Sequence, residues 1–371
     1  MKKTPLTIIS GFKGAGKTTV IDALKASTIN RRIFTLEDDG EKDIFNDIET
    51  VNTMQNPDAI VIECMSNLEP FFVAEHLTFG DDETAAPEGV RIDTMVSVVN
   101  AVTFLDDIRN SEELADHDLA FDDEDDRMVS ELIMEQIEFS DVILLSKVDL
   151  VSPARTDLLL HVLRRLNPRA RVYPCERGVI RPEEIIGTGL FDLETTDDGA
   201  GWLAELAGEF ISRTDTHGVT SFTFRERRPF HPIRFNELLS DFAVDGLLRA
   251  KGYVWVATRH HEIGLWSLAG RASLLTYGGA WFAATPAREW PKDEVERMQI
   301  MQDWVAPFGD RRQEIAFIGV NINETEIRER LQECLLTSEE MIDGPDSWFA
   351  LPDPLPDWHI ESDSESFGDL S

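Results

Sequence analysis

The sequence predicts an α/β fold, with a mostly parallel sheet in a first domain over residues 1–192 and a smaller α+β domain over residues 218–341. Two observations divide the chain in this way. Up to about residue 190, short apolar runs alternate with helical patterns, which is typical of a parallel sheet flanked by helices. Farther along, strands rich in aromatic residues dominate, and all eight tryptophans lie from Trp202 onward.

Six short runs in the first domain have the composition of buried strands. Ile, Val and Leu follow one another almost without interruption in several of them, which predicts strands covered on both faces of the sheet. The runs are Leu6–Ser10, Arg32–Leu36, Ala59–Ile62, Thr94–Asn100, Val142–Leu145 and Arg171–Tyr173. Apolar residues at helical spacing predict two of the covering helices, over Met128–Phe139 and Ala154–Leu166.

The second domain has a different order of elements. Its predicted strands are Thr220–Phe224, Gly252–Ala257, Leu265–Leu268, Ala272–Tyr277 and Ile315–Ile318, and its predicted helices are Ile233–Phe242 and Glu324–Cys334. We interpret the aromatic residues of these strands as core. Polar residues over 193–217 predict a linker between the domains. The Pro-, Asp- and Ser-rich residues 342–371 predict a weakly ordered acidic tail.

The charge of the chain restricts its partners. The sequence has 70 Asp and Glu against 35 Lys and Arg, which gives a formal net charge of -35. Such a surface repels nucleic acid and anionic membranes, so general nucleic-acid binding is not expected. The acidic run Asp116–Asp126 is interpreted as a solvated surface loop. Three cysteines without CxxC spacing, no signal sequence and no membrane-length apolar run favour the reducing cytoplasm.

A phosphate-binding loop is the strongest motif of the chain. Gly11–Thr18 has the spacing GxxxxGK[ST], directly after a predicted strand and before a helical pattern. In such a loop, backbone N–H groups surround a polyphosphate at the N-terminus of the helix. Lys17 is predicted to reach the outer phosphates, and Thr18 to bind Mg²⁺. The predicted phosphate-binding residues are Gly11, Gly14, Ala15, Gly16, Lys17, Thr18 and Thr19.

A second nucleotide element follows the predicted strand Val142–Leu145. Ser146, Lys147 and Asp149 resemble the [NT]KxD motif with which GTPases recognise guanine. In that motif the aspartate accepts hydrogen bonds from the ring N–H and the exocyclic amine of guanine, a pair that adenine cannot offer. The lysine stem covers the base. Ser146 stands where asparagine is usual and loses one contact of the amide, so the resemblance implies binding of GTP and GDP with one contact fewer.

A carboxylate ends the third predicted strand. Glu63 follows Ile62 on the strand that we expect beside the phosphate loop. A carboxylate there can hold Mg²⁺ directly or through water, together with Thr18. We interpret Lys17 and Glu63 as the residues that act in nucleotide hydrolysis. The alternative is that Glu63 only caps the helix that follows.

Together these motifs resemble the CobW-like GTPases associated with metal homeostasis, relatives of the nickel-insertion and urease-accessory GTPases. The family's GFLGAGKTT is similar to Gly11–Thr19, its NEFGE to Glu37–Glu41, its IExSGLAxP to Ile62–Pro70 and its EQIEFADVILLNKxDLV to Glu135–Val151. The C-terminal half agrees as well, for example over Pro229–Phe235. The resemblance implies a P-loop GTPase domain followed by a CobW C-terminal α+β domain.

The chain departs from this family where metal is expected. Family members carry a CxCC motif between the NEFGE and IExSG segments, and here that interval contains no cysteine. Ser66 replaces the glycine whose N–H meets the γ-phosphate in related GTPases. Zn²⁺ binding is therefore expected to be weak, with Cys64 as the candidate ligand. His231 and the run His260–Glu262 are weaker candidates, because adjacent side chains of a strand point apart.

The resemblance implies a GTP-hydrolysing switch that is linked to zinc homeostasis and engages a client protein, with Glu37–Glu41 responding to the γ-phosphate. The alternative is a nucleotide-sensing recruiter without catalysis, such as a zinc-starvation factor acting at the ribosome. The missing CxCC motif and Ser66 favour this alternative, whereas the intact Gly16-Lys17-Thr18 speaks against it. An ATP-dependent kinase is a third alternative, and Asp149 speaks against it. The client, a metalloprotein or a ribosome-associated protein, and the oligomeric state are not encoded in any motif.

Overall fold

The computed structural model describes residues 3–28, 31–38, 44–80, 87–110, 112–122, 125–193, 200–210, 215 and 217–358. The chain forms two compact units. The first consists of residues 1–220 with the short pieces 269–272 and 318–320, and the second consists of residues 221–268, 273–317 and 321–371. The two units are described separately below.

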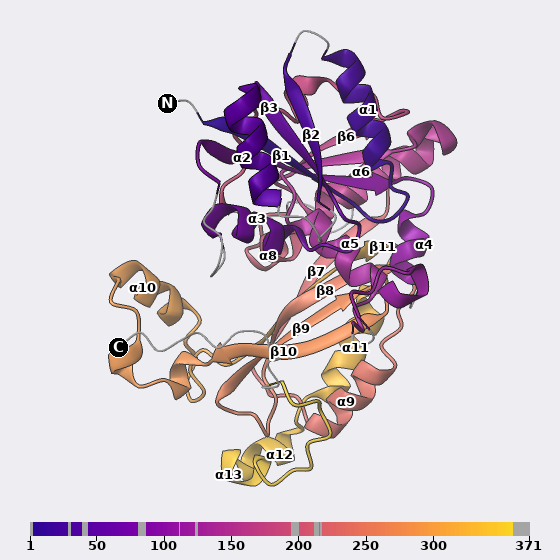
Figure 1. Ribbon diagram of the computed structural model, residues 1–371. Coiled ribbons are helices and arrows are strands. Elements are labelled where there is room, and N and C mark those ends of the chain that lie inside the picture. The colour runs from indigo at the N-terminus through magenta and orange to yellow at the C-terminus, as the bar shows by residue number, and fades with distance from the viewer. Residues whose placement is uncertain are drawn as a thin grey trace. The chain divides into compact units, whose positions relative to one another are not determined.

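A parallel sheet of six strands forms the centre of the first unit, as the sequence predicts (Figure 1). Its strands are β1 (Thr4–Ser10), β2 (Ile33–Asp38), β3 (Ala59–Cys64), β4 (Val90–Asn100), β5 (Val142–Ser146) and β6 (Arg171–Cys175). They lie in the order β2-β3-β1-β4-β5-β6, and each strand runs parallel to its neighbours. Each strand includes most or all of one of the six apolar runs.

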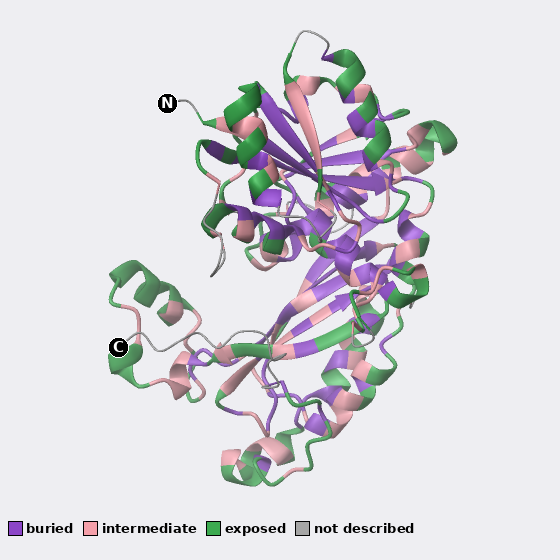
Figure 2. Cartoon of the chain, in the orientation of Figure 1, coloured by how far each residue is buried: buried purple, intermediate pink, exposed green. Residues whose placement is uncertain are grey.

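The helices of this unit bury both faces of the sheet. They are α1 (Lys17–Ser27), α2 (Ile44–Gln55), α3 (Pro70–Phe79), α4 (Phe104–Arg109), α5 (Val129–Glu138), α6 (Pro153–Leu166) and α8 (Gly201–Leu206), with the 3₁₀ turns η1 (Leu114–His117), η2 (Val148–Leu150) and η3 (Pro182–Glu184). Successive strand residues point to opposite faces, so Ile8 packs with α2 and α3 whereas Ile9 packs with α1. Figure 2 shows the result, with buried strands inside and exposed residues on the outer sides of the helices.

The strand order brings three predicted motifs to one edge of the sheet. β1 leads into the phosphate loop, β3 ends at Glu63 and Cys64, and β5 ends at Ser146. The register pairs Ile9 with Glu63 and Asn100 with Ser146. Because all these strands are parallel, their carboxyl ends share an edge, which is where open α/β sheets bind ligands.

The second unit contains a five-stranded sheet in the order β10-β9-β8-β11-β7. Its strands are β7 (Val219–Glu226), β8 (Leu247–Val254), β9 (Glu262–Ala269), β10 (Ala272–Ala280) and β11 (Gln313–Val320). Helices α9 (Pro232–Ser240) and α11 (Glu324–Cys334) pack against this sheet through Phe235 and Leu331 (Figure 1). Phe222, Trp266 and Phe317 are fully buried there, so the aromatic residues form core. Further helices are α10 (Glu294–Gln302), α12 (Ser338–Asp343) and α13 (Pro345–Trp348), with the 3₁₀ turns η5 (Phe282–Ala284) and η6 (Ala287–Glu289).

Two predictions of irregular structure need correction. The predicted linker 193–217 contains helix α8, in which Trp202 is only 8% exposed. The first part of the predicted acidic tail is packed rather than weakly ordered, because Trp348, Leu355 and Trp358 are buried in the second unit. Apolar residues scattered among Pro and Asp are enough to fix this segment. Residues 359–371 lie outside the described part of the chain.

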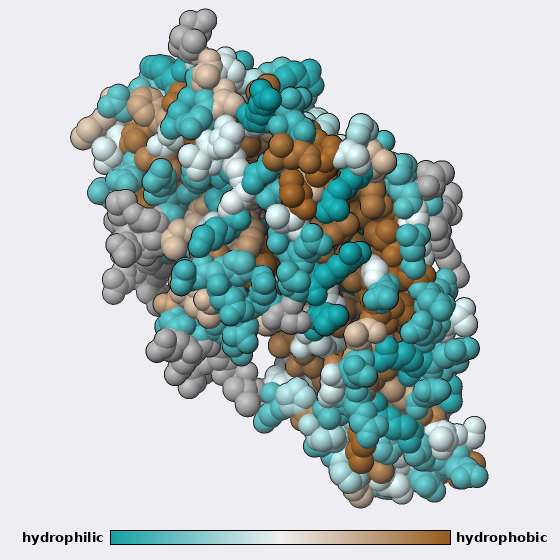
Figure 3. Space-filling view, turned by 90° about the vertical axis from the view of Figure 1, so that its right-hand side faces the viewer, coloured by the Kyte–Doolittle hydropathy of each residue, from teal (hydrophilic) through white to brown (hydrophobic). Residues whose placement is uncertain are grey.

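The surface agrees with the acidic composition. On the face drawn in Figure 3, hydrophilic residues predominate, and apolar residues form patches between them. Within the described residues, no helix has the length and apolar character needed to cross a membrane.

Candidate functional site

The phosphate loop joins β1 to α1 in a conformation that depends on glycine. Gly11, Gly14 and Gly16 have φ angles of 140°, 73° and 106°, which side chains other than glycine rarely adopt. A Cβ on Gly11 would lie 2.5 Å from the Val98 carbonyl oxygen of the neighbouring strand. Helix α1 begins directly after Gly16, so its first N–H groups are turned toward the loop. This geometry fits an anion at the helix N-terminus.

Lys17 is the first residue of α1 and is 8% exposed. Its ammonium donates to the Gly11 carbonyl oxygen at 2.6 Å and to the Ser66 hydroxyl at 2.8 Å. Burial lowers the pKa of Lys17, and the nearby Glu63 carboxylate opposes this effect. Two of the three ammonium donors therefore point to acceptors at the mouth of the loop.

Thr18 and Glu63 also come together. The Thr18 hydroxyl donates to Glu63 Oε1 at 2.7 Å, across 45 positions of sequence. A hydroxyl and a carboxylate are hard oxygen ligands of the kind that Mg²⁺ prefers. The donor chemistry and the close approach of the two side chains therefore fit a magnesium ion beside the phosphate loop.

The predicted base-recognition residues are anchored to the phosphate loop. The Ser146 hydroxyl lies 2.5 Å from the Ala15 carbonyl oxygen and 3.2 Å from that of Val99. Lys147 takes a left-handed conformation with φ 56°, and its ammonium donates to the Gly14 carbonyl oxygen at 2.6 Å. Ser146 thus ties β5 to the loop with a hydroxyl, in the place where the family motif has an asparagine amide.

The loop after β6 completes this part of the site and was not predicted from the sequence. Arg177 Nε lies 3.7 Å from Asp149 Oδ2. Gly178 has φ 76°, and a Cβ at this position would lie 2.4 Å from the Thr19 carbonyl oxygen. The loop therefore passes directly over the start of α1. The dipeptide Arg177–Gly178 after a strand was the only local signal for it.

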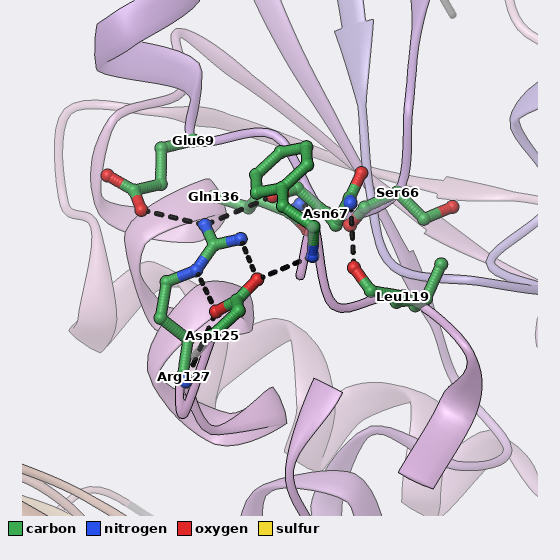
Figure 4. Close-up of polar contacts among 8 residues, drawn as sticks. Ser66, Asn67, Glu69, Leu119, Asp125, Arg127 and Gln136 are labelled. Carbon is green, nitrogen blue, oxygen red and sulfur yellow. Dashed lines mark hydrogen bonds and ion pairs between the residues drawn. The ribbon is translucent and has the colours of Figure 1, made fainter. Parts of the chain in front are cut away.

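A hydrogen-bond network holds the loop that follows β3 (Figure 4). The Gln136 amide donates to the Ser66 carbonyl oxygen at 3.2 Å. The Asn67 amide donates to the Leu119 carbonyl oxygen at 2.7 Å. Ser66 thus accepts a hydrogen bond from Lys17 through its hydroxyl and one from Gln136 of α5 through its backbone carbonyl oxygen. A glycine at this position could accept only the second.

Arg127 extends this network. Its guanidinium donates to both carboxylate oxygens of Asp125, each at 2.8 Å, to Glu69 at 2.9 Å and to the Asn67 carbonyl oxygen at 3.2 Å (Figure 4). Its hydrogen bonds to Asp125 raise the pKa of Arg127 above its usual range, and those same bonds lower the pKa of Asp125 to about 2. The side chain of Asp125 is only 7% exposed. Within the described part of the run Asp116–Asp126, Asp125 is therefore held by Arg127, whereas Asp116, Asp118, Asp122 and Asp126 are exposed as expected of a solvated loop.

The phosphate loop contacts the same acidic segment. The Lys13 ammonium donates to the His117 carbonyl oxygen at 2.8 Å, and the Phe12 ring meets the His117 ring edge-on at 5.3 Å. His117 thus contacts the phosphate loop, and Leu119 and Arg127 contact the loop after β3.

The other predicted metal ligands include Cys64 in the first unit, and His231 and His260 in the second. Cys64 is 2% exposed within the core between β3 and α3, and burial raises its pKa above its usual range. Among the described residues, Cys64 belongs to no group of three metal-ligand side chains. His260 is buried among aromatic rings of the second unit, and burial lowers its pKa to about 4. Neither His231 nor His260 belongs to a group of three metal-ligand side chains among the described residues.

The proposed switch segment is only partly visible. Glu37 and Asp38 end β2, and their register partners are Glu63 and Cys64 on β3. This places the start of the segment beside the Thr18–Glu63 pair. Residues 39–41 of the predicted switch lie outside the described residues.

Comparison with known proteins identifies the family. Residues 35–174 match the CobW/HypB/UreG nucleotide-binding domain, and residues 219–335 match the cobalamin synthesis protein cobW C-terminal domain. A protein of Dictyostelium discoideum named zinc-regulated GTPase metalloprotein activator 1 is 33% identical over 95% of this chain and 84% of its own length. The chain belongs to the CobW family.

This CobW-family chain is also similar to a second curated protein and to a solved structure. The zinc chaperone Rv0106 of Mycobacterium tuberculosis is 32% identical over 73% of this chain and 63% of its own length. Among solved structures, the Zn(II)-bound YjiA GTPase of E. coli aligns over 91% of this chain and all of that chain, with 19% identity and a TM-score of 0.39.

Proposed function

We propose that this CobW-family protein binds GTP with Mg²⁺, hydrolyses it to GDP and phosphate, and uses the change of nucleotide to engage a client protein in zinc supply. The observation that carries the proposal is the placement of Lys17, the Thr18–Glu63 pair and the Lys147–Asp149 segment at one edge of the sheet. In this proposal Lys17 binds the phosphates, Thr18 and Glu63 bind Mg²⁺, and the Lys147–Asp149 segment binds the base of the same nucleotide. The names of two relatives support the link to zinc.

Each element has a defined task in the proposed reaction. Lys17 and the N–H groups at the start of α1 hold the phosphates, and Asp149 accepts hydrogen bonds from the base. Thr18 and Glu63 would hold Mg²⁺, which would supply positive charge beside the phosphate oxygens.

The proposed coupling starts at Ser66. The γ-phosphate oxygens of GTP and the Ser66 hydroxyl compete for the same Lys17 ammonium. A change at Ser66 reaches Leu119 and Arg127 through the Asn67–Leu119 and Glu69–Arg127 hydrogen bonds. The nucleotide thereby alters a surface segment that lies outside the site, which is the property a client-binding switch needs.

Replacing Ser66 tests this competition. Ser66→Ala removes the hydroxyl but leaves the backbone, so Lys17 no longer has to exchange one acceptor for another. We expect GTP to bind about 3- to 10-fold more tightly, which is the size of one partly exposed, charge-assisted hydrogen bond. Calorimetry on the wild type, Ser66→Ala and the control Ser27→Ala at the far end of α1 measures it. Weaker binding by Ser66→Ala would show that the hydroxyl assists the phosphate instead.

Phosphate release tests the proposed activity. We expect Mg²⁺-dependent GTP turnover by the wild type, a large loss in Glu63→Gln and no change in Glu49→Gln, which alters an exposed carboxylate of α2. Turnover is measured without transition metal and with Zn²⁺, Co²⁺ or Ni²⁺, and a response to Zn²⁺ is the expected result. GTP binding without phosphate release under any of these conditions would favour the alternative of a nucleotide-sensing recruiter.

A further inference from the structure

A group of metal-ligand side chains lies outside the nucleotide site. His161 is in the third turn of α6, and Asp215 and His217 precede β7; all three belong to the first unit. Each offers one ligand atom, and the three atoms lie within 4.8 Å of one another. All three residues are partly buried. The described residues contain no second group of three His, Cys, Asp or Glu with this geometry.

We propose that His161, Asp215 and His217 bind one divalent transition-metal ion of the Zn²⁺ class. Two imidazoles and a carboxylate suit Zn²⁺ and Co²⁺, whereas Mg²⁺ and Ca²⁺ prefer oxygen ligands alone. Three protein ligands leave a fourth tetrahedral position for water or another donor. The site uses none of the nucleotide-binding residues and does not depend on GTP.

Helix α6 orients the ring of His161. Its Nδ1 lies 2.8 Å from the Asp157 carbonyl oxygen, one helical turn earlier. A carbonyl oxygen can only accept a hydrogen bond, so Nδ1 of the neutral ring carries the proton and Nε2 carries the lone pair. A second ring nitrogen that donates to a backbone carbonyl is a common arrangement around metal-binding histidines, because it fixes both the tautomer and the direction of the ligand atom.

The turn before β7 orients the carboxylate. Asp215 Oδ1 accepts hydrogen bonds from the backbone N–H groups of His217 at 2.8 Å and Val219 at 3.0 Å. The backbone N–H of Asp215 donates to the Val219 carbonyl oxygen at 3.0 Å, which closes the turn. These bonds hold Oδ1 in the turn, and Oδ2 is the oxygen available to a metal. The same turn places His217 two residues away from Asp215.

The two histidine rings already touch. Their centroids are 3.8 Å apart with 28° between the planes. In a tetrahedral zinc site with bonds of about 2.1 Å, ligand atoms are roughly 3.4 Å apart, so modest side-chain rotation brings the three atoms into range. Stacked rings cannot direct both lone pairs to one ion, so metal binding has to rotate at least one ring. This rotation gives the proposal a spectroscopic signature.

Arg165 lies one turn beyond His161 on α6. It interacts electrostatically with Asp215 and Glu205, while burial lowers its pKa. Its guanidinium lies over the Phe210 ring, 4.2 Å from the centroid. This stacking holds the guanidinium against Phe210, and Glu205 offsets part of its positive charge. The acidic chain as a whole attracts divalent cations.

Titration of the full chain with Zn²⁺ in excess Mg²⁺ tests the site. We expect the wild type to bind one Zn²⁺ at this site and His161→Ala or His217→Ala to bind it at least about 10-fold more weakly. Asp215→Asn keeps an oxygen for the turn and loses only the charge, so it is expected to fold normally and to bind Zn²⁺ more weakly. His261→Ala removes an exposed histidine of the second unit and is the matched control. Thermal unfolding with chelator present verifies that each variant is folded.

Two further readouts make the outcome decisive. Co²⁺ should give visible absorption bands in the wild type and in His261→Ala that are lost in His161→Ala. The imidazole ¹⁵N resonances of His161 and His217 should shift when Zn²⁺ is added. Equal Zn²⁺ affinity in the wild type and both histidine variants, or no Zn²⁺ binding by a wild-type chain that binds GTP normally, would overturn the proposal. Either result leaves the proposed GTPase activity untouched.

Discussion

Lys17→Ala is expected to abolish GTP binding. The Lys17 ammonium is held at the mouth of the phosphate loop by the Gly11 carbonyl oxygen and the Ser66 hydroxyl, where it can turn to the outer phosphate oxygens. Charge-assisted hydrogen bonds to several phosphate oxygens are lost together, so affinity should fall by at least about 100-fold. Calorimetric titration with GTP and Mg²⁺ measures the loss.

The matched control for this variant lies on the same helix. Lys25→Ala removes an exposed lysine from the last turn of α1 and should leave GTP affinity unchanged. Burial lowers the pKa of Lys17, so Lys17→Ala should not destabilise the fold and its thermal unfolding should match that of the wild type or exceed it. A folded Lys17→Ala protein that binds GTP with wild-type affinity would show that nucleotide binds elsewhere.

Asp149→Asn is expected to exchange guanine specificity for xanthine specificity. Guanine presents two donors, the ring N–H and the exocyclic amine, and a carboxylate accepts both. An amide accepts only one of them and turns its own donors toward the other, so GTP affinity should fall on the order of 100-fold. Xanthine has a carbonyl oxygen in place of the amine, which an asparagine amide can donate to. Xanthosine triphosphate should therefore bind the variant more tightly than GTP does.

Competition between fluorescent GDP and unlabelled GTP, ATP or xanthosine triphosphate measures this change of specificity. Asp22→Asn on the exposed side of α1 is the control for loss of one negative charge. If Asp149→Asn weakens all three nucleotides equally, the carboxylate supports the fold of the site through Arg177 and does not read the base.

The fold was predictable because its signals are local. Val142–Ser146 is buried at every position, so its composition alone identifies a strand covered on both faces. The phosphate loop is equally local, since its glycines and Lys17 lie within one short stretch. The packed segment 345–358 was missed because its three buried apolar residues lie far apart among Pro and Asp, without the period of a helix or strand.

The parts of the site that were not predicted from the sequence depend on contacts between segments that are far apart in the chain. Ser66 was predicted only as an altered γ-phosphate contact. In the structure its hydroxyl accepts a hydrogen bond from Lys17, which is 49 positions away in the sequence. Arg127 was passed over because an arginine beside a long acidic run indicates solvation, and only the fold brings Glu69 and Asn67 to it. In the His161–Asp215–His217 group only Asp215 and His217 are close in sequence, and His161 lies more than 50 residues before them. Such contacts become visible only once the strand order is known.

Calorimetric titration of the wild-type chain with GTP and then with ATP, in the presence of Mg²⁺, tests guanine-nucleotide binding most directly. The expected result is one GTP bound per chain, with ATP at least about 100-fold weaker, because adenine offers Asp149 no matching pair of donors. Equal affinity for the two nucleotides, or no measurable binding of GTP by the folded chain, would contradict it.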